Sequence, residues 1–307
     1  MNINLNNNDF YEIYGLKLKS HIPIHNKLLI KDSNKIDAYV TLGKTNSFFN
    51  TNNHDCGIFK FSKDRAYFNI NNIASYEILN GSKIIIEPAE NSNLEEIKKY
   101  LIGSALGILL FQRDNLAIHG SSIVINNKVF IFSGDIGAGK TTLVSSLINK
   151  GYGFLSDDIS SISNFINNKY YVYHSFPHQK LCEKTAEYFG YKIESLYKID
   201  KVKNKYYSPY IKTFCNSPKE LKSIIYLQSI DCDNASHHEV FGVDKFKLIL
   251  SNIFRKEILP NYLISPLFVK KCLTLSSKIK VYKIIRPKYK DSINELIDIV
   301  EYLALKD

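Results

Sequence analysis

Short apolar runs separated by Asn, Ser, Asp and Gly fill the chain up to Pro88, a pattern typical of strands joined by turns. The runs lie at Ala38–Leu42, Ile58–Phe61, Ala66–Ile70 and Lys83–Glu87. The period then changes, because apolar residues share one helix face at Leu94, Ile97, Leu101, Ile102, Ala105, Ile108 and Leu109. Asn93 and Glu96 have the spacing of a capping box, so we predict that a helix closes a strand-rich region.

Two apolar runs between Ile118 and Phe132 surround Asn126-Asn127-Lys128 and predict a hairpin. Its second strand, Val129–Phe132, is continuously apolar, so we expect it to be central and buried. The sequence GDIGAGKTT follows at once, and then a helix that ends near Lys150 with Gly151 as its C-terminal cap. A short strand at Phe154-Leu155, expected next to the loop strand Val129–Phe132, leads to Asp157-Asp158.

The remainder alternates between strand and helix patterns. Strands are expected at Tyr170–Tyr173, Ser223–Leu227 and Lys280–Ile285, helices at Leu181–Phe189, Phe246–Ile253 and Ile293–Val300, and a polar lysine-rich loop at Lys198–Lys205. Such alternation from residue 116 onward predicts an α/β domain with a mostly parallel or mixed sheet. At 307 residues, the chain is long enough for two domains, and we place them at 1–115 and 116–307.

The net charge of +10 does not by itself indicate nucleic-acid binding. Only four of the 40 basic residues are arginine, and the lysines are spread along the chain rather than gathered in one patch. The longest apolar run, residues 101–111, is shorter than the ~20 residues of a membrane-spanning helix. The first ten residues lack the pattern of a secretory signal, so we expect a cytoplasmic protein with no membrane or nucleic-acid partner. The five cysteines are far apart and predict neither disulfides nor a zinc site.

The segment Gly134-Asp135-Ile136-Gly137-Ala138-Gly139-Lys140-Thr141 fits the phosphate-binding (P-loop) pattern G-x-x-x-x-G-K-[ST] between a predicted strand and helix. Its glycines allow backbone N–H groups to surround phosphates, Lys140 supplies a positive charge, and Thr141 offers a hydroxyl to Mg²⁺. With the adjoining Thr142, residues 134–142 are therefore the predicted nucleotide-binding loop.

Asp157 and Asp158 follow Lys140 by only 17 and 18 residues, at the end of the next strand. Two carboxylates there could divide the chemistry, one accepting a proton from an attacking hydroxyl and the other helping to hold Mg²⁺. The alternative is an ordinary turn or helix cap, which Asp-Asp before Ile-Ser-Ser would also suit. His119, before Gly120, is open to a structural or a catalytic interpretation, and periodicity alone favours the structural one, because a lone His is more often structural.

The ordered set His119-Gly120, GDIGAGKTT and NKGYGFLSDD resembles the catalytic core of HPr kinase/phosphorylase, most specifically over residues 116–160. The N-terminal Tyr14-Gly15-Leu16 and Ser20-His21-Ile22-Pro23, with segments 100–103 and 109–113, are similar to the HPr-kinase-related branch that includes lasso-peptide precursor serine kinases. The proline- and glycine-rich signature of the HPr enzymes after the core is missing, which argues against HPr recognition, hexamer assembly and phosphorolysis.

This resemblance implies an α/β fold with a P-loop core of the HPr kinase/PEP carboxykinase type, preceded by a strand-rich α+β domain. It implies ATP and Mg²⁺ as cofactors. It also implies Asp157 as base, His119 as its neighbour near the γ-phosphate, Lys140 on the phosphates, and Thr141 and Asp158 as metal or positioning groups. The implied activity is phosphorylation of a Ser or Thr hydroxyl of a peptide or small protein, such as a lasso-type precursor.

Two other functions remain open at this stage: a nucleotide-binding regulator or adaptor without phosphotransfer, and a small-molecule kinase. The sequence does not identify the acceptor. It also leaves the oligomeric state open, and a homo-oligomer is among the states that it allows. The N-terminal region has no catalytic motif and is a natural place to hold the acceptor.

Three further groups of residues have both a functional and an ordinary structural interpretation. The lysines of 198–205 suit a lid over phosphates or a solvated face, and His237-His238-Glu239 suits a surface loop better than a metal cluster. The third group is tyrosines, which suit a peptide groove or ordinary packing: Tyr170, Tyr171, Tyr173, Tyr206, Tyr207 and Tyr210.

Overall fold

A computed structural model describes residues 8–31, 34–46, 58–62, 64–200, 204–259 and 264–306 of the chain, which is a mixed α/β protein with several sheets. The chain divides into two compact units. The first contains residues 1–117 and 254–270, and the second residues 118–253 and 271–307. Residues 254–270 thus belong to the first unit, although they lie far beyond the predicted boundary at 115/116.

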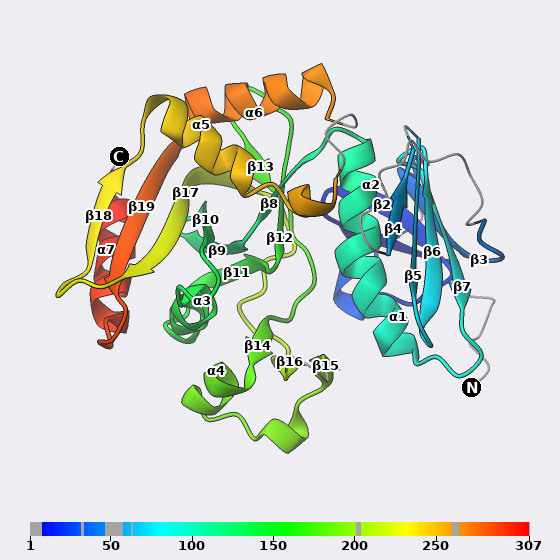
Figure 1. Cartoon of the computed structure of the whole chain (residues 1–307), viewed down its shortest axis with the longest axis horizontal. Helices are drawn as coiled ribbons and strands as arrows, with labels where there is room; N and C mark the ends of the chain where they lie inside the picture. The colour runs from blue at the N-terminus through cyan, green and yellow to red at the C-terminus, as the bar shows by residue number, and fades with distance from the viewer. Residues whose placement is uncertain are drawn as a thin grey trace. The chain divides into compact units, whose positions relative to one another are not determined.

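The first unit is a seven-stranded sheet with one long helix against it (Figure 1). The sheet order is β1-β2-β3-β7-β6-β5-β4, and β3 pairs in parallel with β2 and β7. The strands are β1 (Asp9–Ile13), β2 (Leu16–Ser20), β3 (Ala38–Leu42), β4 (Phe59–Phe61), β5 (Arg65–Ile70), β6 (Ala74–Leu79) and β7 (Lys83–Pro88). Four of these match predicted runs, whereas β1, β2 and β6 were not predicted.

The predicted closing helix forms as α1 (Leu94–Tyr100) and α2 (Leu106–Gln112), joined by a π-helical segment at Leu101–Ala105. The Asn93 side chain caps it by accepting a hydrogen bond from the amide of Glu95 at 2.8 Å. Two buried tyrosines hold the helix to the sheet: Tyr76 donates to the carbonyl of Ile97 and Tyr14 to that of Ile102. The apolar helix face predicted from the sequence is therefore the face that covers this sheet.

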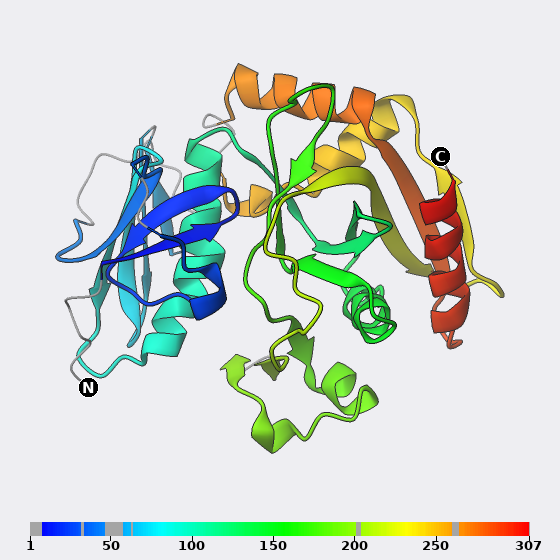
Figure 2. The ribbon, with the colours of Figure 1, turned by 180° about the vertical axis from the view of Figure 1, so that it is seen from behind.

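The second unit is built on a nine-stranded mixed sheet (Figure 2). Along it run β11-β9-β10-β17-β13-β12-β8, and β19 lies beside β17 with β18 at its outer side. The strands are β8 (Leu116–His119), β9 (Ser121–Ile125), β10 (Lys128–Gly134), β11 (Gly153–Ser156), β12 (Ile159–Ile162), β13 (Tyr171–Val172), β17 (Lys219–Ile230), β18 (Ser236–Glu239) and β19 (Lys280–Pro287). The predicted hairpin forms as β9–β10, and positive φ at Asn126 and Asn127 suits its two-residue turn.

Helices cover both faces of this sheet. Phe132 and Ile225 point to the face covered by α3 (Lys140–Asn149) and α7 (Ile293–Leu305), and they share one buried cluster with Leu143 and Leu296. On the other face, α5 (Gly242–Ser251) covers Ser133 and Ile224, the alternate positions of the same strands. The remaining long helix, α6 (Pro266–Lys278), begins in the first unit and ends in the second.

A small third sheet, β14-β16-β15, stands apart from the main one. It consists of β14 (Lys180–Cys182), β15 (Lys198–Asp200) and β16 (Lys205–Tyr207), with α4 (Glu183–Tyr188) between β14 and β15. Two predictions are corrected here. The helix predicted at Leu181–Phe189 begins only at Glu183, because Leu181 and Cys182 belong to β14, and both ends of the predicted lysine-rich loop pair with each other. Of the lysines named there, Lys201 and Lys203 lie outside the described residues.

Three parallel strands bring their carboxyl ends to one edge of the main sheet. Gly134 of β10 pairs with Leu227 of β17, and Leu227 pairs with Ile284 of β19. Such an edge is where α/β sheets bind ligands, because the helices that follow the strands begin there. The segment 134–142 lies at this edge.

Candidate functional site

The segment 134–142 connects β10 to α3 as a glycine turn whose backbone no other residue type would adopt easily. Gly134 has φ of 138°, and a Cβ there would lie 2.0 Å from the carbonyl oxygen of Leu227. Gly137 has φ of 79°, in the left-handed region. The glycines therefore allow the loop to lie close against β17 and to turn into the start of α3.

Lys140, the first residue of α3, folds back over the loop. Its Nζ donates to the carbonyl oxygens of Gly134 and Asp135, each at 2.7 Å. Burial lowers the pKa of Lys140, the charges of Asp135 and Asp157 oppose this, and the charge of Lys205 adds to it. Two carbonyl oxygens thus hold the Lys140 ammonium group, and a bound anion could take their place. Lys205 adds positive potential around Lys140.

Asp135 anchors the loop to the neighbouring strand. Its carboxylate accepts hydrogen bonds from Tyr226 Oη at 2.5 Å and from Gln228 Nε2 at 3.2 Å, both on β17. The pKa of Tyr226 rises to about 12 through its burial and then this contact. Ile136, at the tip of the loop, is fully exposed. The loop is therefore fixed at its base and open at its tip.

Asp157 lies just after β11 and both of its oxygens accept hydrogen bonds. Oδ1 accepts from Ser121 Oγ at 2.5 Å and Oδ2 from the backbone N–H of Lys180 at 2.8 Å. Burial, followed by the charge of Asp158, raises the pKa of Asp157 above its usual value, although the two hydrogen bonds and the Lys180 charge partly oppose this. A carboxylate has about four lone-pair positions, so Asp157 can still accept a further proton donor.

Asp158 turns the other way and pairs with a lysine. Its Oδ2 lies 2.7 Å from Nζ of Lys180, and its Oδ1 lies 3.5 Å from Nδ1 of His119. Asp158 has φ of 68°, a left-handed conformation that an Asp adopts at some cost. Burial acts to lower the pKa of Lys180, but the charge of Asp158, with further help from Tyr207 and Asp157, keeps it above the usual value. Lys180 is therefore the cation that balances the two acids.

His119 ends β8 and is half-exposed, while its backbone is held firmly. Its N–H donates to the carbonyl of Asn252 at 2.7 Å, and its own carbonyl accepts from Ser133 Oγ at 2.7 Å. On its side chain, Nδ1 lies 3.2 Å from the carbonyl oxygen of Asp158. The structure thus brings His119, Asp157 and Asp158 together, as their place in one predicted site requires.

The strand that precedes the two acids, β11, has a different neighbour from the one predicted. β11 does not lie beside the loop strand β10, because β9, the first strand of the hairpin, already occupies that position. It is Ser121 on β9 that holds Asp157. Neither Ser121 nor Lys180 was singled out from the sequence. Ser121 stands two residues after His119, a usable signal, whereas nothing in the local pattern at Lys180 connects it to the acids.

Gln179, next to Lys180, connects the acids to the start of α3. Its side chain accepts from Ser145 Oγ at 2.6 Å and donates to the carbonyl oxygen of Thr141 at 3.3 Å. It is almost fully buried. Since Gln179 and Lys180 are consecutive, the small sheet that begins at β14 fixes the spacing between the loop and the acids.

The chemistry of these donors suits Mg²⁺ bound together with phosphate. Mg²⁺ usually takes one or two carboxylates or hydroxyls from the protein and completes its shell with phosphate oxygens and water. Such donors are Thr141, on the loop, and Asp158, next to the proposed base Asp157. Within the described residues there is no group of three or more His, Cys, Asp or Glu that could hold a metal ion alone.

The other predicted candidates differ in where the structure places them. His237, His238 and Glu239 form the edge strand β18, not a surface loop, because they pair with β19. Tyr170 and Tyr206 are buried packing residues. In contrast, Tyr207 and Tyr210 join an aromatic cluster with Phe176 and His178, in which ring centroids lie 5.0–6.4 Å apart.

No described helix is long and apolar enough to cross a membrane. None of the four cysteines in the described part of the chain forms a disulfide, and Cys56 lies outside it.

Comparison with known proteins finds a structural similarity but no sequence match. No family model and no curated protein sequence matches it. Among solved structures, it is similar to the Hpr(Ser) kinase/phosphatase from Coxiella burnetii, with 15% identity and a TM-score of 0.34, over 62% of this chain and 91% of that one. So low a score assigns no family, and the function proposed below rests on the residues and their geometry.

Proposed function

We propose that this protein is an ATP- and Mg²⁺-dependent kinase that transfers the γ-phosphoryl group to a Ser or Thr hydroxyl of a peptide or small protein. The observation that carries the proposal is the environment of Asp157. This carboxylate is held by Ser121 and Lys180, its pKa is raised, and its charge is felt by Lys140 of the glycine loop. A carboxylate of raised pKa near a phosphate-binding loop is suited to accept the proton of an acceptor hydroxyl during phosphoryl transfer.

In this proposal the backbone N–H groups of residues 134–142 and Nζ of Lys140 hold the β- and γ-phosphates. Mg²⁺, when bound, neutralises charge on the phosphates, with Thr141 and Asp158 as its protein donors. Lys180 keeps Asp158 in place and limits repulsion between the two acids. His119, beside Asp158, is proposed to donate to a phosphate oxygen.

The transfer itself is an in-line displacement. Asp157 accepts the proton of the acceptor hydroxyl, the hydroxyl oxygen forms a bond to the γ-phosphorus, and the bond from that phosphorus to the β–γ bridging oxygen breaks, so that ADP leaves. The protein contributes position and charge, which are the main requirements of this reaction.

The aromatic cluster of Phe176, His178, Tyr207 and Tyr210 favours a peptide acceptor over a small molecule. Tyr207 pairs with Lys180 in the small sheet, so the cluster begins next to the acids. Tyr210 is 40% exposed, and partly exposed aromatic rings are common where proteins bind peptides. A ribosomal precursor peptide of the lasso type is one acceptor of this kind.

The proposal is tested by incubating the protein with Mg-ATP and the short peptides encoded beside its gene, followed by mass spectrometry. We expect one peptide to gain a phosphoryl group on Ser or Thr, and Asp157→Asn to abolish the gain. Asp298→Asn, an exposed acid on α7, is the matched control and should act like wild type. Nucleotide binding without transfer to any peptide or small metabolite would instead identify a nucleotide-binding regulator.

A further inference from the structure

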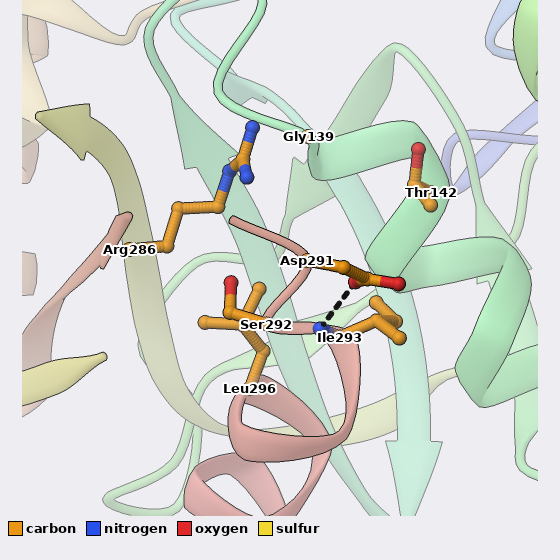
Figure 3. Close-up of a pocket in the computed structure, with 7 residues that line it drawn as sticks. All are labelled: Gly139, Thr142, Arg286, Asp291, Ser292, Ile293 and Leu296. Carbon is orange, nitrogen blue, oxygen red and sulfur yellow. Dashed lines mark hydrogen bonds between the residues drawn. The ribbon is translucent and has the colours of Figure 1, made fainter. Parts of the chain in front are cut away.

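A pocket of about 90 Å³ lies beside the start of α3, in the second unit (Figure 3). Its walls come from two segments that are far apart in the sequence. One is the loop and the first turn of α3, and the other is the connection from β19 to α7. The lining residues are Gly139, Thr142, Arg286, Asp291, Ser292, Ile293 and Leu296.

The walls combine an apolar floor with a few fixed polar groups. Leu296 and Ile293 supply the apolar part. Arg286 is pinned across the top, since its Nε donates to the carbonyl oxygen of Ala138 and its Nη1 to that of Pro287, both at 2.9 Å. Asp291 stands at the rim, where its Oδ1 accepts the backbone N–H of Ile293 at 3.0 Å (Figure 3).

Ser292 supplies an observation that packing does not explain. The residue is 96% buried, as its exposed fraction is 4%. Its hydroxyl oxygen has no hydrogen-bond partner within the described residues, and Figure 3 shows it directed toward Arg286 across the pocket. A buried hydroxyl without a partner is costly, because it has lost its water and gained nothing in exchange. A ligand in the pocket would restore the missing hydrogen bond.

The pocket and the acids lie on opposite sides of the loop strand. β10 has β9 on one side, whose Ser121 holds Asp157, and β17 and then β19 on the other, after which the pocket is formed. A nucleotide is a linear molecule with its phosphates at one end. If its γ-phosphate faces Asp157 across the loop, its nucleoside end leaves on the side of β19, where this pocket lies.

The size of the pocket fits one part of such a molecule. A volume of about 90 Å³ is well below the ~300–1,000 Å³ of a site that encloses a whole drug-sized ligand. It exceeds the space of a single water several times. The pocket therefore suits the insertion of a flat ring while ribose and phosphates remain outside, along Thr142 and the loop.

We propose that this pocket is the base subsite of the donor nucleotide and that it reads the amino group of an aminopurine. This proposal rests on the proposed nucleotide-binding function. Asp291 accepts hydrogen bonds only, so the base edge that faces it must carry a donor, as the amino groups of adenine and guanine do. Ser292 both donates and accepts, and so it can pair with a ring nitrogen or a carbonyl oxygen of the same base.

The test compares four ligands by calorimetry in the presence of Mg²⁺: ATP, GTP, ITP and inorganic tripolyphosphate. Tripolyphosphate has the phosphates without a nucleoside, and ITP has a purine without an amino group. We expect ATP or GTP to bind wild type at least tenfold more tightly than both other ligands, and the identity of the tighter one names the base. This advantage should fall to less than about threefold in Asp291→Ala and weaken in the milder Ser292→Ala. Asp298→Asn should keep it.

The outcomes separate this proposal from the one on which it rests. Equal affinity of wild type for all four ligands would overturn the base subsite while leaving the phosphate loop intact. The subsite is also overturned if the variants weaken tripolyphosphate and nucleotide alike, or change neither. Binding of none of the four ligands would refute the nucleotide-binding function itself.

Discussion

Replacing Asp157 by Asn tests the proposed base with little disturbance of the structure. Asp157 accepts one hydrogen bond from the hydroxyl of Ser121 and one from the backbone N–H of Lys180. The Ser121 hydroxyl can also act as an acceptor. An Asn side chain can direct its carbonyl oxygen at that N–H and its NH₂ group at Ser121 Oγ, so both contacts survive. Only the basicity and the charge are lost.

The expected loss of turnover follows from the role of a general base, which contributes about 10²–10⁴-fold. Turnover of Asp157→Asn should therefore fall at least ~100-fold, or about 2.7 kcal/mol in activation free energy, while nucleotide affinity changes by no more than a few-fold. Steady-state kinetics with a phosphorylated peptide as the readout measures the first quantity, and calorimetry the second.

The same variant has an expected effect on stability, with the sign set by the raised pKa of Asp157. An acid whose pKa is higher in the folded state destabilises the fold when ionised. This penalty is absent below the unfolded pKa, grows as pH rises from there, and is complete above the folded pKa. At neutral pH, Asp157→Asn should therefore melt no lower than wild type, and any gain should shrink as pH falls through the pKa of Asp157.

Wild-type turnover should fall in acid as Asp157 becomes protonated, with an apparent pKa above the usual value for Asp. The reasoning is refuted if Asp157→Asn retains more than a tenth of the wild-type turnover. It is also refuted if the variant loses activity and melting temperature together, because that would indicate a structural cap.

The remaining predictions concern three other parts of the chain. Lys140→Ala should abolish the rise in melting temperature that Mg-ATP gives wild type, while Lys212→Ala, an exposed lysine, should keep it; equal rises in both would exclude the loop as the binding site. Lys180→Met should lower turnover at least tenfold and shift the acid limb of the pH–rate profile to higher pH, because the lysine charge no longer favours ionisation of Asp157, and Lys180→Arg should restore part of both; an unshifted pH profile would reduce Lys180 to a packing residue. We also propose that the N-terminal domain, residues 1–115, takes part in holding the acceptor, so that an accepted peptide should slow amide hydrogen exchange there as well as near Asp157; protection confined to residues 116–305 would count against this role.

Much of the fold was predictable because its elements are specified locally. The run Val129–Phe132 was predicted as a central buried strand, and β10 does lie between β9 and β17. Gly151 follows α3 with φ of 97°, as a capping glycine should. The elements that were missed carry weaker local signals. β14 and β18 are short or polar and exist because a partner strand is supplied from elsewhere in the chain.

The sequence by itself indicated the components of the candidate site that stand in short motifs: the glycine loop with Lys140 and Thr141, and the Asp157-Asp158 pair. Each motif depends on spacing within a few residues, which the linear pattern records, whereas His119 was added by the resemblance. Tertiary structure alone decided which groups act on them. Lys180 meets the acids from 22 residues away, and Arg286 reaches the loop from the end of β19. Such contacts depend on strand order and register, which are set by how the sheet packs and leave no mark in the sequence around either residue.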